Sequence, residues 1–311
     1  TGYRLDTGNG RIHQFNVTIE RQIKDIGLRL TYMGSRNRGM NYSLSINKPQ
    51  ASLTPFAQAR RPWPAFVGGS YFRSDGEQNF NALTLQAQRK LGHLTFDVHW
   101  TLASNMSTML NTENPYAPRL WNRDANTSRN RAVANIVWRL PVGRGQRYLS
   151  QVPAVVDRLL GGWQLYWIAF FESGRFFTPS FSGSDPSNTN TSGGLPDRVC
   201  DGNLPSSRRS IHRWFDASCF VVPPQGRFGN SGTNVLEGPG NHLENIAVAK
   251  TFRLTERLNF TFTAAALNFL NDPNFAMPAA NISSPGTVGR VSDLTWSGGH
   301  RVMEIRGRLD F

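Results

Sequence analysis

The carboxyl-terminal stretch Arg301-Val-Met-Glu-Ile-Arg-Gly-Arg-Leu-Asp-Phe311 determines how the rest of the chain is interpreted. Side chains of a β-strand alternate between its two faces, which gives this stretch an apolar face formed by Met303, Ile305, Leu309 and Phe311. Its other face is charged and is formed by Glu304, Arg306, Arg308 and Asp310. Gly307 interrupts the apolar face once. A soluble sheet can contain one such strand, so the interpretation depends on whether the pattern recurs.

The same alternation recurs along the chain. It is clearest in residues 94–102, where the even-numbered positions are apolar and the odd-numbered positions are polar, from Thr95 to Thr101. Apolar–polar alternation over several residues, bounded by turn residues, predicts half-buried strands. We predict about ten strands of about ten residues each, at 11–22, 26–32, 65–74, 80–91, 94–102, 129–141, 163–171, 242–254, 257–270 and 301–311.

Connections of two lengths separate these strands. Short turns are expected at Lys24-Asp25, Asp75-Gly76, Gly92 and Thr255-Glu256. Long loops rich in polar residues, glycine and proline are expected at 34–64, 103–128, 174–240 and 271–298. Short turns at one end and long loops at the other, joined by alternating strands, are typical of an all-β, antiparallel transmembrane β-barrel. We therefore predict that residues 1–311 form strands and loops of such a barrel. The alternative is a soluble β-sandwich whose aromatic residues form its core.

Composition agrees with a membrane barrel and argues against a transmembrane helix. The 311 residues are 39% hydrophobic, and the mean hydropathy is −0.41. No apolar run approaches the length of about eighteen residues that a spanning helix needs. The net charge of +13 predicts an anionic partner. Because the arginines are scattered rather than clustered, the phosphate-rich face of an outer membrane, with its lipid and lipopolysaccharide, is favoured over nucleic acid.

Two cysteines, Cys200 and Cys219, lie in the loop predicted at 174–240. They are interpreted either as a structural disulfide or as a metal or redox pair. The sequence contains no C-x-x-C motif and no histidine pair nearby, which favours the disulfide. A disulfide in turn indicates an oxidising compartment.

The sequence contains no recognisable catalytic motif. G-x-S-x-G and H-E-x-x-H are both absent, and the six histidines lack metal-ligand spacing. Asp197, Asp201 and Asp216 could bind Ca²⁺ through their oxygens, but the surrounding sequence is not EF-hand-like, and solvated loop residues are the simpler interpretation. We therefore expect no enzyme activity, no cofactor and no metal, and the ligand-binding residues cannot be identified at this stage.

Several stretches, in their shared order, resemble one family. They are Arg60-Arg-Pro-Trp-Pro64, Asn79-Phe-Asn-Ala-Leu83, Leu140-Pro-Val-Gly-Arg-Gly145, Gly161-Gly-Trp-Gln-Leu165, Gly193-Gly-Leu-Pro-Asp-Arg-Val-Cys-Asp-Gly-Asn-Leu-Pro205, Arg213-Trp-Phe-Asp216, Gly226-Arg-Phe-Gly-Asn-Ser-Gly232, Leu236-Glu-Gly-Pro-Gly240, Lys250-Thr-Phe-Arg-Leu-Thr-Glu-Arg-Leu-Asn-Phe-Thr-Phe262 and Leu267-Asn-Phe-Leu-Asn-Asp-Pro-Asn-Phe275. From about residue 40 to 311, the chain resembles the C-terminal barrel region of TonB-dependent receptor-like outer-membrane proteins, specifically the Oar-like group that bears a carboxypeptidase-regulatory domain.

This resemblance implies a larger protein, similar to a barrel of about 22 strands with an N-terminal plug and a segment that engages TonB. The ten predicted strands would be the last ten, and the other strands, the plug and the TonB-engaging segment would lie upstream. It further implies that Phe311, with Leu309, is the signal read by the barrel-assembly machinery. Cys200 and Cys219 would form a disulfide in an extracellular loop, with the short turns in the periplasm.

The function expected from this resemblance is binding and import of a bulky ligand across the outer membrane. Two other functions remain open. One is a non-transporting structural or adhesive surface protein that displays its loops or assembles with copies of itself. The other is a secreted β-sandwich enzyme, which would require a catalytic constellation that the sequence does not contain.

Overall fold

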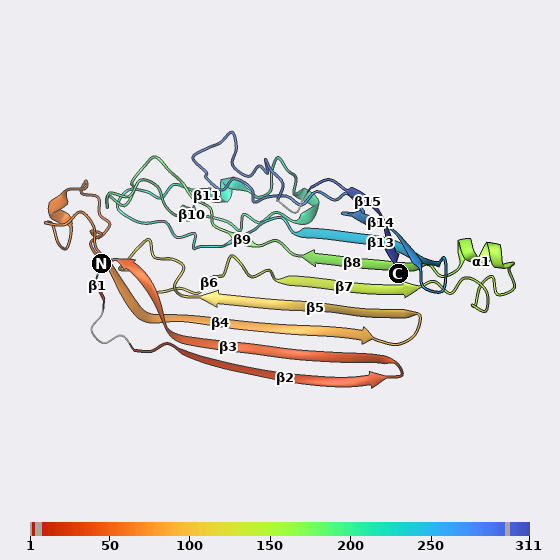
Figure 1. The fold of residues 1–311 in the computed structure, drawn as a ribbon. Coiled ribbons are helices and arrows are strands. Elements are labelled where there is room, and N and C mark those ends of the chain that lie inside the picture. Colours follow the sequence, from red (N-terminus) through yellow and green to blue (C-terminus); the bar gives the residue numbers. More distant parts are fainter. Residues whose placement is uncertain (1, 4–7, 296–298) are drawn as a thin grey trace.

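One antiparallel sheet dominates the computed structural model, which describes residues 2–3, 8–295 and 299–311 (Figure 1). Nine long strands of this described part follow one another across the sheet in chain order. They are β2 (Arg11–Ile23), β3 (Ile26–Ser45), β4 (Ser70–Arg89), β5 (Leu94–Ser107), β7 (Asn130–Arg139), β8 (Gln164–Glu172), β13 (Asn241–Arg253), β14 (Asn259–Leu267) and β15 (Val302–Asp310).

Shorter elements decorate this sheet. Six pieces are only two residues long: β1 (Gly2–Tyr3), β6 (Asn122–Arg123), β9 (Phe176–Phe177), β10 (Asp197–Arg198), β11 (Phe220–Val221) and β12 (Leu236–Glu237). The helical pieces are α1 (Ala154–Leu160) and the 3₁₀ turns η1 (Gln58–Arg60), η2 (Ser206–Arg208) and η3 (Ala217–Cys219). No helix in the described part of the chain is long and apolar enough to cross a membrane.

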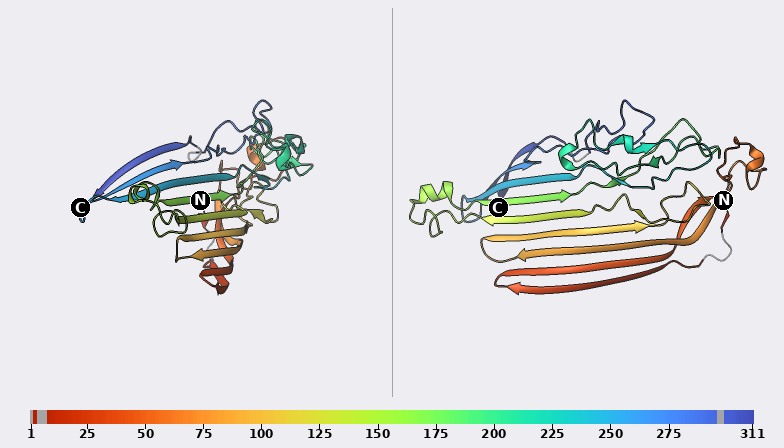
Figure 2. Two further views of the ribbon diagram at one scale, coloured as in Figure 1. Left: turned by 90° about the vertical axis from the view of Figure 1, so that its right-hand side faces the viewer. Right: turned by 180° about the vertical axis from the view of Figure 1, so that it is seen from behind.

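The two ends of the sheet carry different connections. The two-residue turn at Lys24-Asp25, the short turns after β4 and β13, and the longer segment with α1 lie at one end (Figure 1). The segments 46–69, 108–129, 173–240 and 268–295 gather toward the other end, and we call these four segments the loop layer. The left-hand view of Figure 2 shows the sheet as a curved wall rather than a closed tube.

The two faces of the sheet differ in chemistry. Strand register aligns Ile19, Leu30, Leu85 and Trp100 across β2 to β5. The neighbouring register positions, on the opposite face, are Glu20, Arg29, Gln86 and His99. Side chains of this second face contact one another through polar groups. For example, Arg29 Nε lies 2.6 Å from Glu20 Oε1. The period-two alternation of the sequence therefore separates an apolar face from a polar one.

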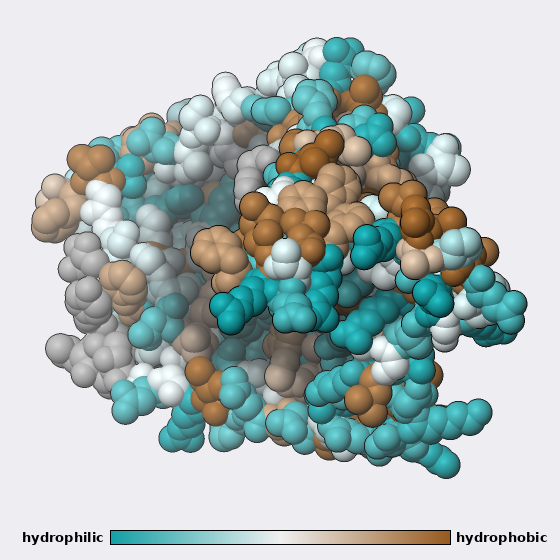
Figure 3. Space-filling model, turned by 45° about the vertical axis from the view of Figure 1, so that its right-hand side comes forward, coloured by the Kyte–Doolittle hydropathy of each residue, from teal (hydrophilic) through white to brown (hydrophobic). Residues whose placement is uncertain are grey.

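Most of the apolar face is exposed. Leu30 is 37% exposed, Leu85 46% and Ile305 78%. The large side chains that are fully buried, such as Phe215 and Leu236, belong instead to the loop layer. A contiguous apolar surface of this extent is rare on soluble monomers and indicates contact with lipid or another apolar partner. Figure 3, which brings the α1 end forward, shows hydrophobic side chains (brown) exposed between hydrophilic ones (teal).

The structure corrects the turn predicted at Asp75-Gly76. The strands predicted at 65–74 and 80–91 are a single strand, β4, of 20 residues. Gly76 pairs with Met40 of β3, where the register shifts, so an irregularity of the bulge type replaces the turn. Gly76 has no positive φ, and a Cβ there would meet Met109 Sδ at 2.5 Å. Glycine at this position lets the Met109 side chain approach the backbone closely. The sequence Asp-Gly instead suggested a turn.

The merger of these two strands gives nine long strands where about ten were predicted. β3 also continues to Ser45, into the loop predicted at 34–64. Beyond residue 34, β3 stays paired with β4 through its main chain, and the pairing ends at Ser45 opposite Ser70. Backbone pairing does not require alternating hydrophobicity, so the sequence pattern stopped before the strand did.

The loop layer has a hydrophobic core of its own. Phe215 is 2% exposed, and its ring lies 5.8 Å from that of Phe177 and 6.0 Å from that of Phe220. Cys219 and Leu236 complete this buried cluster. Edge-to-face aromatic pairs and buried apolar area stabilise segments that otherwise have little regular structure.

Substitution Phe215→Ala tests this core. It leaves a cavity beside Phe177 and Phe220, and we expect the loop layer to lose about 3–5 kcal/mol of stability. Limited proteolysis should then cleave residues 173–240 at lower protease concentration, while the long strands stay protected. Val199→Ala is the control, because Val199 is 63% exposed. Equal protease resistance of the Phe215→Ala variant and the wild type would contradict the assignment of this core.

Candidate functional site

The four segments of the loop layer bond to one another and form one body. Arg60 Nη1 donates to the carbonyl of Asn188 at 2.8 Å. Asn234 Nδ2 donates to the carbonyl of Arg123 at 2.6 Å. The amide of Ser180 donates to the carbonyl of Ala280 at 3.0 Å. These contacts join segments more than fifty residues apart, so the layer is organised for a surface or cavity rather than for independent loops.

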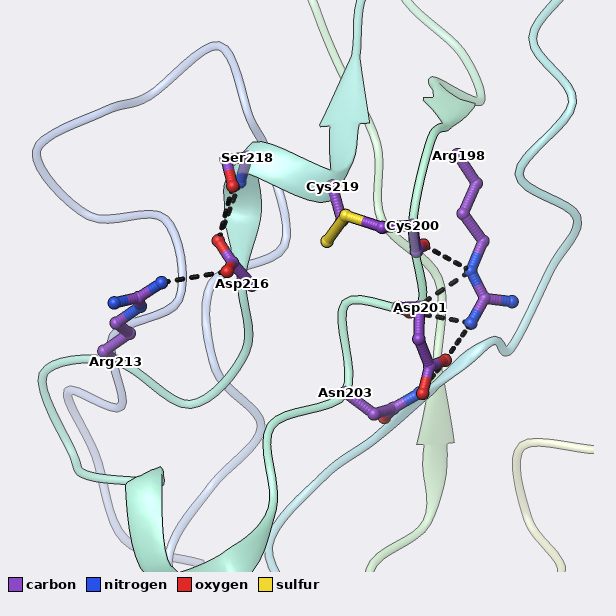
Figure 4. Close-up of a disulfide and its surroundings, with 8 residues drawn as sticks. All are labelled: Arg198, Cys200, Asp201, Asn203, Arg213, Asp216, Ser218 and Cys219. Carbon is purple, nitrogen blue, oxygen red and sulfur yellow. Dashed lines mark hydrogen bonds and ion pairs between the residues drawn. A yellow bond between two sulfur atoms is a disulfide. The ribbon is translucent and has the colours of Figure 1, made fainter.

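Cys200 and Cys219 form a disulfide within this layer (Figure 4). Their Cα atoms are 4.8 Å apart. The neighbouring strands β10 and β11 pair antiparallel, with Arg198 opposite Phe220. The covalent bond therefore fixes a turn-rich segment against the buried aromatic cluster.

The three aspartates considered for Ca²⁺ lie apart and have separate basic partners. Asp197 pairs with Arg227, Asp201 with Arg198, and Asp216 with Arg213. Figure 4 shows two of these pairs on either side of the disulfide. The Ser218 hydroxyl beside Asp216 lowers the pKa of that carboxyl, and Arg213 adds to the effect. No metal-binding group of histidine, cysteine and acidic residues is found in the described residues.

Two half-buried ionisable side chains, Lys48 and Glu113, link the first three loop segments. Lys48 Nζ donates to the main-chain carbonyl of Glu113 at 2.9 Å. The Glu113 carboxylate in turn accepts from the amide of Leu195 at 3.0 Å. Burial raises the pKa of Glu113, although the Leu195 amide and Lys48 oppose it. Burial likewise lowers the pKa of Lys48.

A polar cavity of about 480 Å³ opens between β6, β9 and the disulfide-containing segment. It is lined by Met106, Trp121, Asn122, Arg123, Arg129, Phe176, Arg198, Asp201, Asn203, Thr233, Asn234, Val235 and Glu237. Its volume lies within the range of about 300–1,000 Å³ typical of small-molecule sites. The cavity combines cationic, aromatic and amide groups, which suits recognition of a polar ligand.

The outer strands of the sheet, β2 and β15, are its two edges. Each pairs with a single neighbour among the described residues, β2 with β3 and β15 with β14. All thirteen residues of β2 are exposed. Unpaired edge groups next to an exposed apolar face are stable in lipid only when further strands cover them.

Comparison with known proteins agrees with this geometry. The family model described as "Outer membrane beta barrel domain" matches residues 1–304. The chain belongs to the outer membrane β-barrel domain family. This membership assigns the chain to the outer membrane and its all-β antiparallel sheet to a barrel.

Among solved structures, this barrel chain is similar to the outer membrane transporter YddB from Escherichia coli. The TM-score is 0.49 at 8% sequence identity. The match covers 98% of this chain and 33% of the transporter, so the chain spans about a third of that protein's length. The search of curated proteins gave no match.

The predicted assembly residues, Leu309 and Phe311, lie in β15 and directly after it. Leu309 is 55% exposed on the apolar face of β15, and Phe311 follows that strand fully exposed. Their role in assembly stays a prediction. Of the residues that line the cavity, sequence analysis considered Asp201, but as a possible Ca²⁺ ligand. It did not identify Arg123, Arg129 or Phe176, because these fall in or beside stretches interpreted only as polar loops.

Lipid contact predicts an asymmetric response to charge at Leu85 and Gln86. Adjacent positions of β4, they lie on opposite faces of the sheet. Leu85→Arg inserts a cation into the apolar face, and we expect a loss of about 2–4 kcal/mol in folding free energy. Gln86→Arg is the matched control, because Gln86 already bonds to Asp97 at 2.8 Å. Denaturant titration of the protein in phosphatidylcholine vesicles measures both, and equal losses would contradict the assignment of the two faces.

Asp185 predicts acid sensitivity of the loop layer. Burial opposes ionisation of its carboxyl, but hydrogen bonds from the Ser187 hydroxyl and from three loop amides lower its pKa below 3.8. A carboxyl with a lowered folded-state pKa stabilises the fold above its unfolded-state pKa and loses that effect as pH falls through the folded-state value. We expect Asp185→Asn to be less stable than wild type by a constant amount above about pH 5, with the difference shrinking below about pH 4.

Thermal unfolding followed by tryptophan fluorescence from pH 7 to pH 3 measures this difference. Asp124→Asn is a suitable control, since Asp124 also accepts hydrogen bonds within one loop, from Asn126 and Thr127. A difference between wild type and Asp185→Asn that stays constant down to pH 3 would contradict the assigned role of the Asp185 carboxylate.

Proposed function

We propose that the chain is the C-terminal barrel part of a TonB-dependent receptor-like outer-membrane protein that binds a bulky ligand and imports it. The observation that carries this proposal is the pair of free edges on a nine-strand wall whose apolar face is exposed. A wall of this kind requires further strands to close it, because lipid cannot bond to unpaired amides and carbonyls. A longer protein of the receptor class supplies such strands upstream.

The loop layer supports a ligand-binding role. Its segments bond to one another over long sequence separations and enclose a polar cavity rather than extending separately. In the proposed orientation this layer is extracellular, with lipopolysaccharide around the wall, and the short turns are periplasmic. A plug from the upstream part of the protein completes the pore, and TonB acts through that part.

The last strand fits the proposed assembly route. The exposed edge of β15, with Leu309 and Phe311 on or after it, is accessible to the barrel-assembly machinery. Binding and passage of a ligand need no reacting group, and we propose no catalytic role and no nucleic-acid partner for this chain.

The test is the intact mass of the native protein in a carbonate-washed outer-membrane fraction, detected through a peptide from residues 241–311. A mass of about three times the 34.8 kDa of this chain is expected for a complete receptor with about 22 strands. In vivo crosslinking of that protein to TonB is the second expected result.

Other outcomes contradict the proposal in distinct ways. A membrane protein of about 34.8 kDa that does not crosslink to TonB would overturn import and indicate a small structural or adhesive barrel that assembles from copies. Absence from the membrane fraction would overturn both the receptor and the small barrel, and would favour a soluble β-sandwich.

A further inference from the structure

Two arginines in the polar cavity of the loop layer share one aromatic ring. Arg123 lies in β6, Arg129 shortly before β7, and Phe176 in β9. The guanidinium carbon of Arg123 is 4.8 Å from the centre of the Phe176 ring, and that of Arg129 is 5.7 Å from it. The ring thus holds two cations in the same cavity by cation–π contact.

Neither guanidinium has an ionic partner. Across residues 8–295 and 299–311, no carboxylate forms an ion pair with Arg123 or Arg129, and no hydrogen bond from either guanidinium is observed. Other arginines of the loop layer do have partners, such as Arg198 with Asp201 and Arg227 with Asp197. Unlike these two arginines, Arg123 and Arg129 line the cavity without an ionic partner.

The two like charges raise each other's energy. Burial lowers the pKa of Arg123, and the nearby Arg129 lowers it further, whereas Glu237 acts in the opposite direction. Glu237 lines the cavity without reaching ion-pair distance, and Asp201 is already bonded to Arg198 and Asn203. An anion entering the cavity would relieve the repulsion between the two guanidinium groups.

The cavity walls are held in place before any ligand arrives. Asn234 Nδ2 donates to the carbonyl of Arg123 at 2.6 Å, and Asn122 Oδ1 accepts from the amide of Thr233 at 3.1 Å. Figure 4 shows another wall, in which Arg198, Asp201 and Asn203 bond to one another. A preorganised site binds with less loss of conformational entropy than a mobile loop.

A buried hydroxyl provides an independent observation. Thr233 lines the cavity, and its Oγ1 is buried without a hydrogen-bond partner among the described residues. A buried hydroxyl left unbonded is unfavourable, so this wall of the cavity has a second polar group without a partner, beside the two guanidinium groups. Trp121 adds an aromatic surface to the same cavity.

We propose that this cavity binds the carboxylate or phosphate group of an anionic ligand, with Arg123 and Arg129 as its charge partners and Phe176 and Trp121 against its apolar part. The inference rests on the proposed function in taking the loop layer as the ligand-binding region, and it names the chemical class of that ligand. Paired guanidinium groups suit carboxylate and phosphate because they present several N–H donors in a planar arrangement.

The test uses the full native protein in a neutral detergent, with phenyl phosphate and benzoate as anionic probes and benzyl alcohol as the uncharged control. Tryptophan fluorescence and calorimetry follow binding. We expect saturable binding of the two anions, weakened by salt, and no saturable binding of benzyl alcohol. Arg123→Gln and Arg129→Gln should each weaken binding by about tenfold, as expected for loss of a charge-assisted hydrogen bond.

Arg144→Gln is the matched control, because Arg144 is an exposed arginine in the connection that carries α1, and it should bind as the wild type does. Circular dichroism and protease resistance of each variant confirm that the loop layer is folded. Absence of saturable anion binding, or equal binding by the Arg123→Gln and Arg144→Gln variants, would overturn the site.

Vesicles containing lipopolysaccharide distinguish two sources of the anion. Displacement of phenyl phosphate by these vesicles, but not by vesicles of phosphatidylcholine, supports a lipid phosphate as the occupant. Binding that survives both supports a free solute. If the protein binds anions but does not crosslink to TonB, the proposed import is wrong and the anion site stands. If the protein crosslinks to TonB but binds no anion, the anion site is wrong and the proposed import stands.

Discussion

The requirement that every backbone amide and carbonyl be bonded in lipid governs this structure. Inside the sheet, β2 to β15 satisfy it through neighbours that follow one another in the chain. Among the described residues, the edge strands β2 and β15 each leave a row of main-chain groups open. The exposed apolar face agrees with a barrel wall that lies in lipid, where such a row must be covered.

Alternation predicted the strands well, because it reflects the faces that the side chains occupy. Leu94 to Leu102 were identified as a strand and lie in β5. The prediction was wrong at Asp75-Gly76, because a glycine can indicate either a turn or a close contact within a strand. Here Gly76 lies inside β4, at a register shift, and leaves room for the Met109 side chain. The prediction also ended β3 too early, because its pairing with β4 continues to Ser45 through residues that lack an alternating apolar face.

The cavity could not be predicted for a different reason. Arg123 and Arg129 come from one segment of the loop layer, Phe176 and Thr233 from another, and only the folded layer brings them together. Nothing in their local sequence separates them from the many other arginines and threonines. The disulfide was easier to anticipate, since the chain has only two cysteines. Sequence patterns report periodic structure, whereas a site built from loops depends on contacts with no period.

The unequal length of the strands has a consequence for how the wall stands in the membrane. β3 and β4 each have 20 residues, whereas β8, β14 and β15 each have nine. At about 3.3 Å per residue, the long pair extends about 66 Å and the short strands about 30 Å. Since the apolar band of such barrels is about 25 Å tall, β3 and β4 extend well beyond it, whereas β8, β14 and β15 end near its edge and continue as segments of the loop layer. On one flank of the wall, paired strands therefore form the part of the protein that projects beyond the bilayer, and on the other flank irregular segments form it.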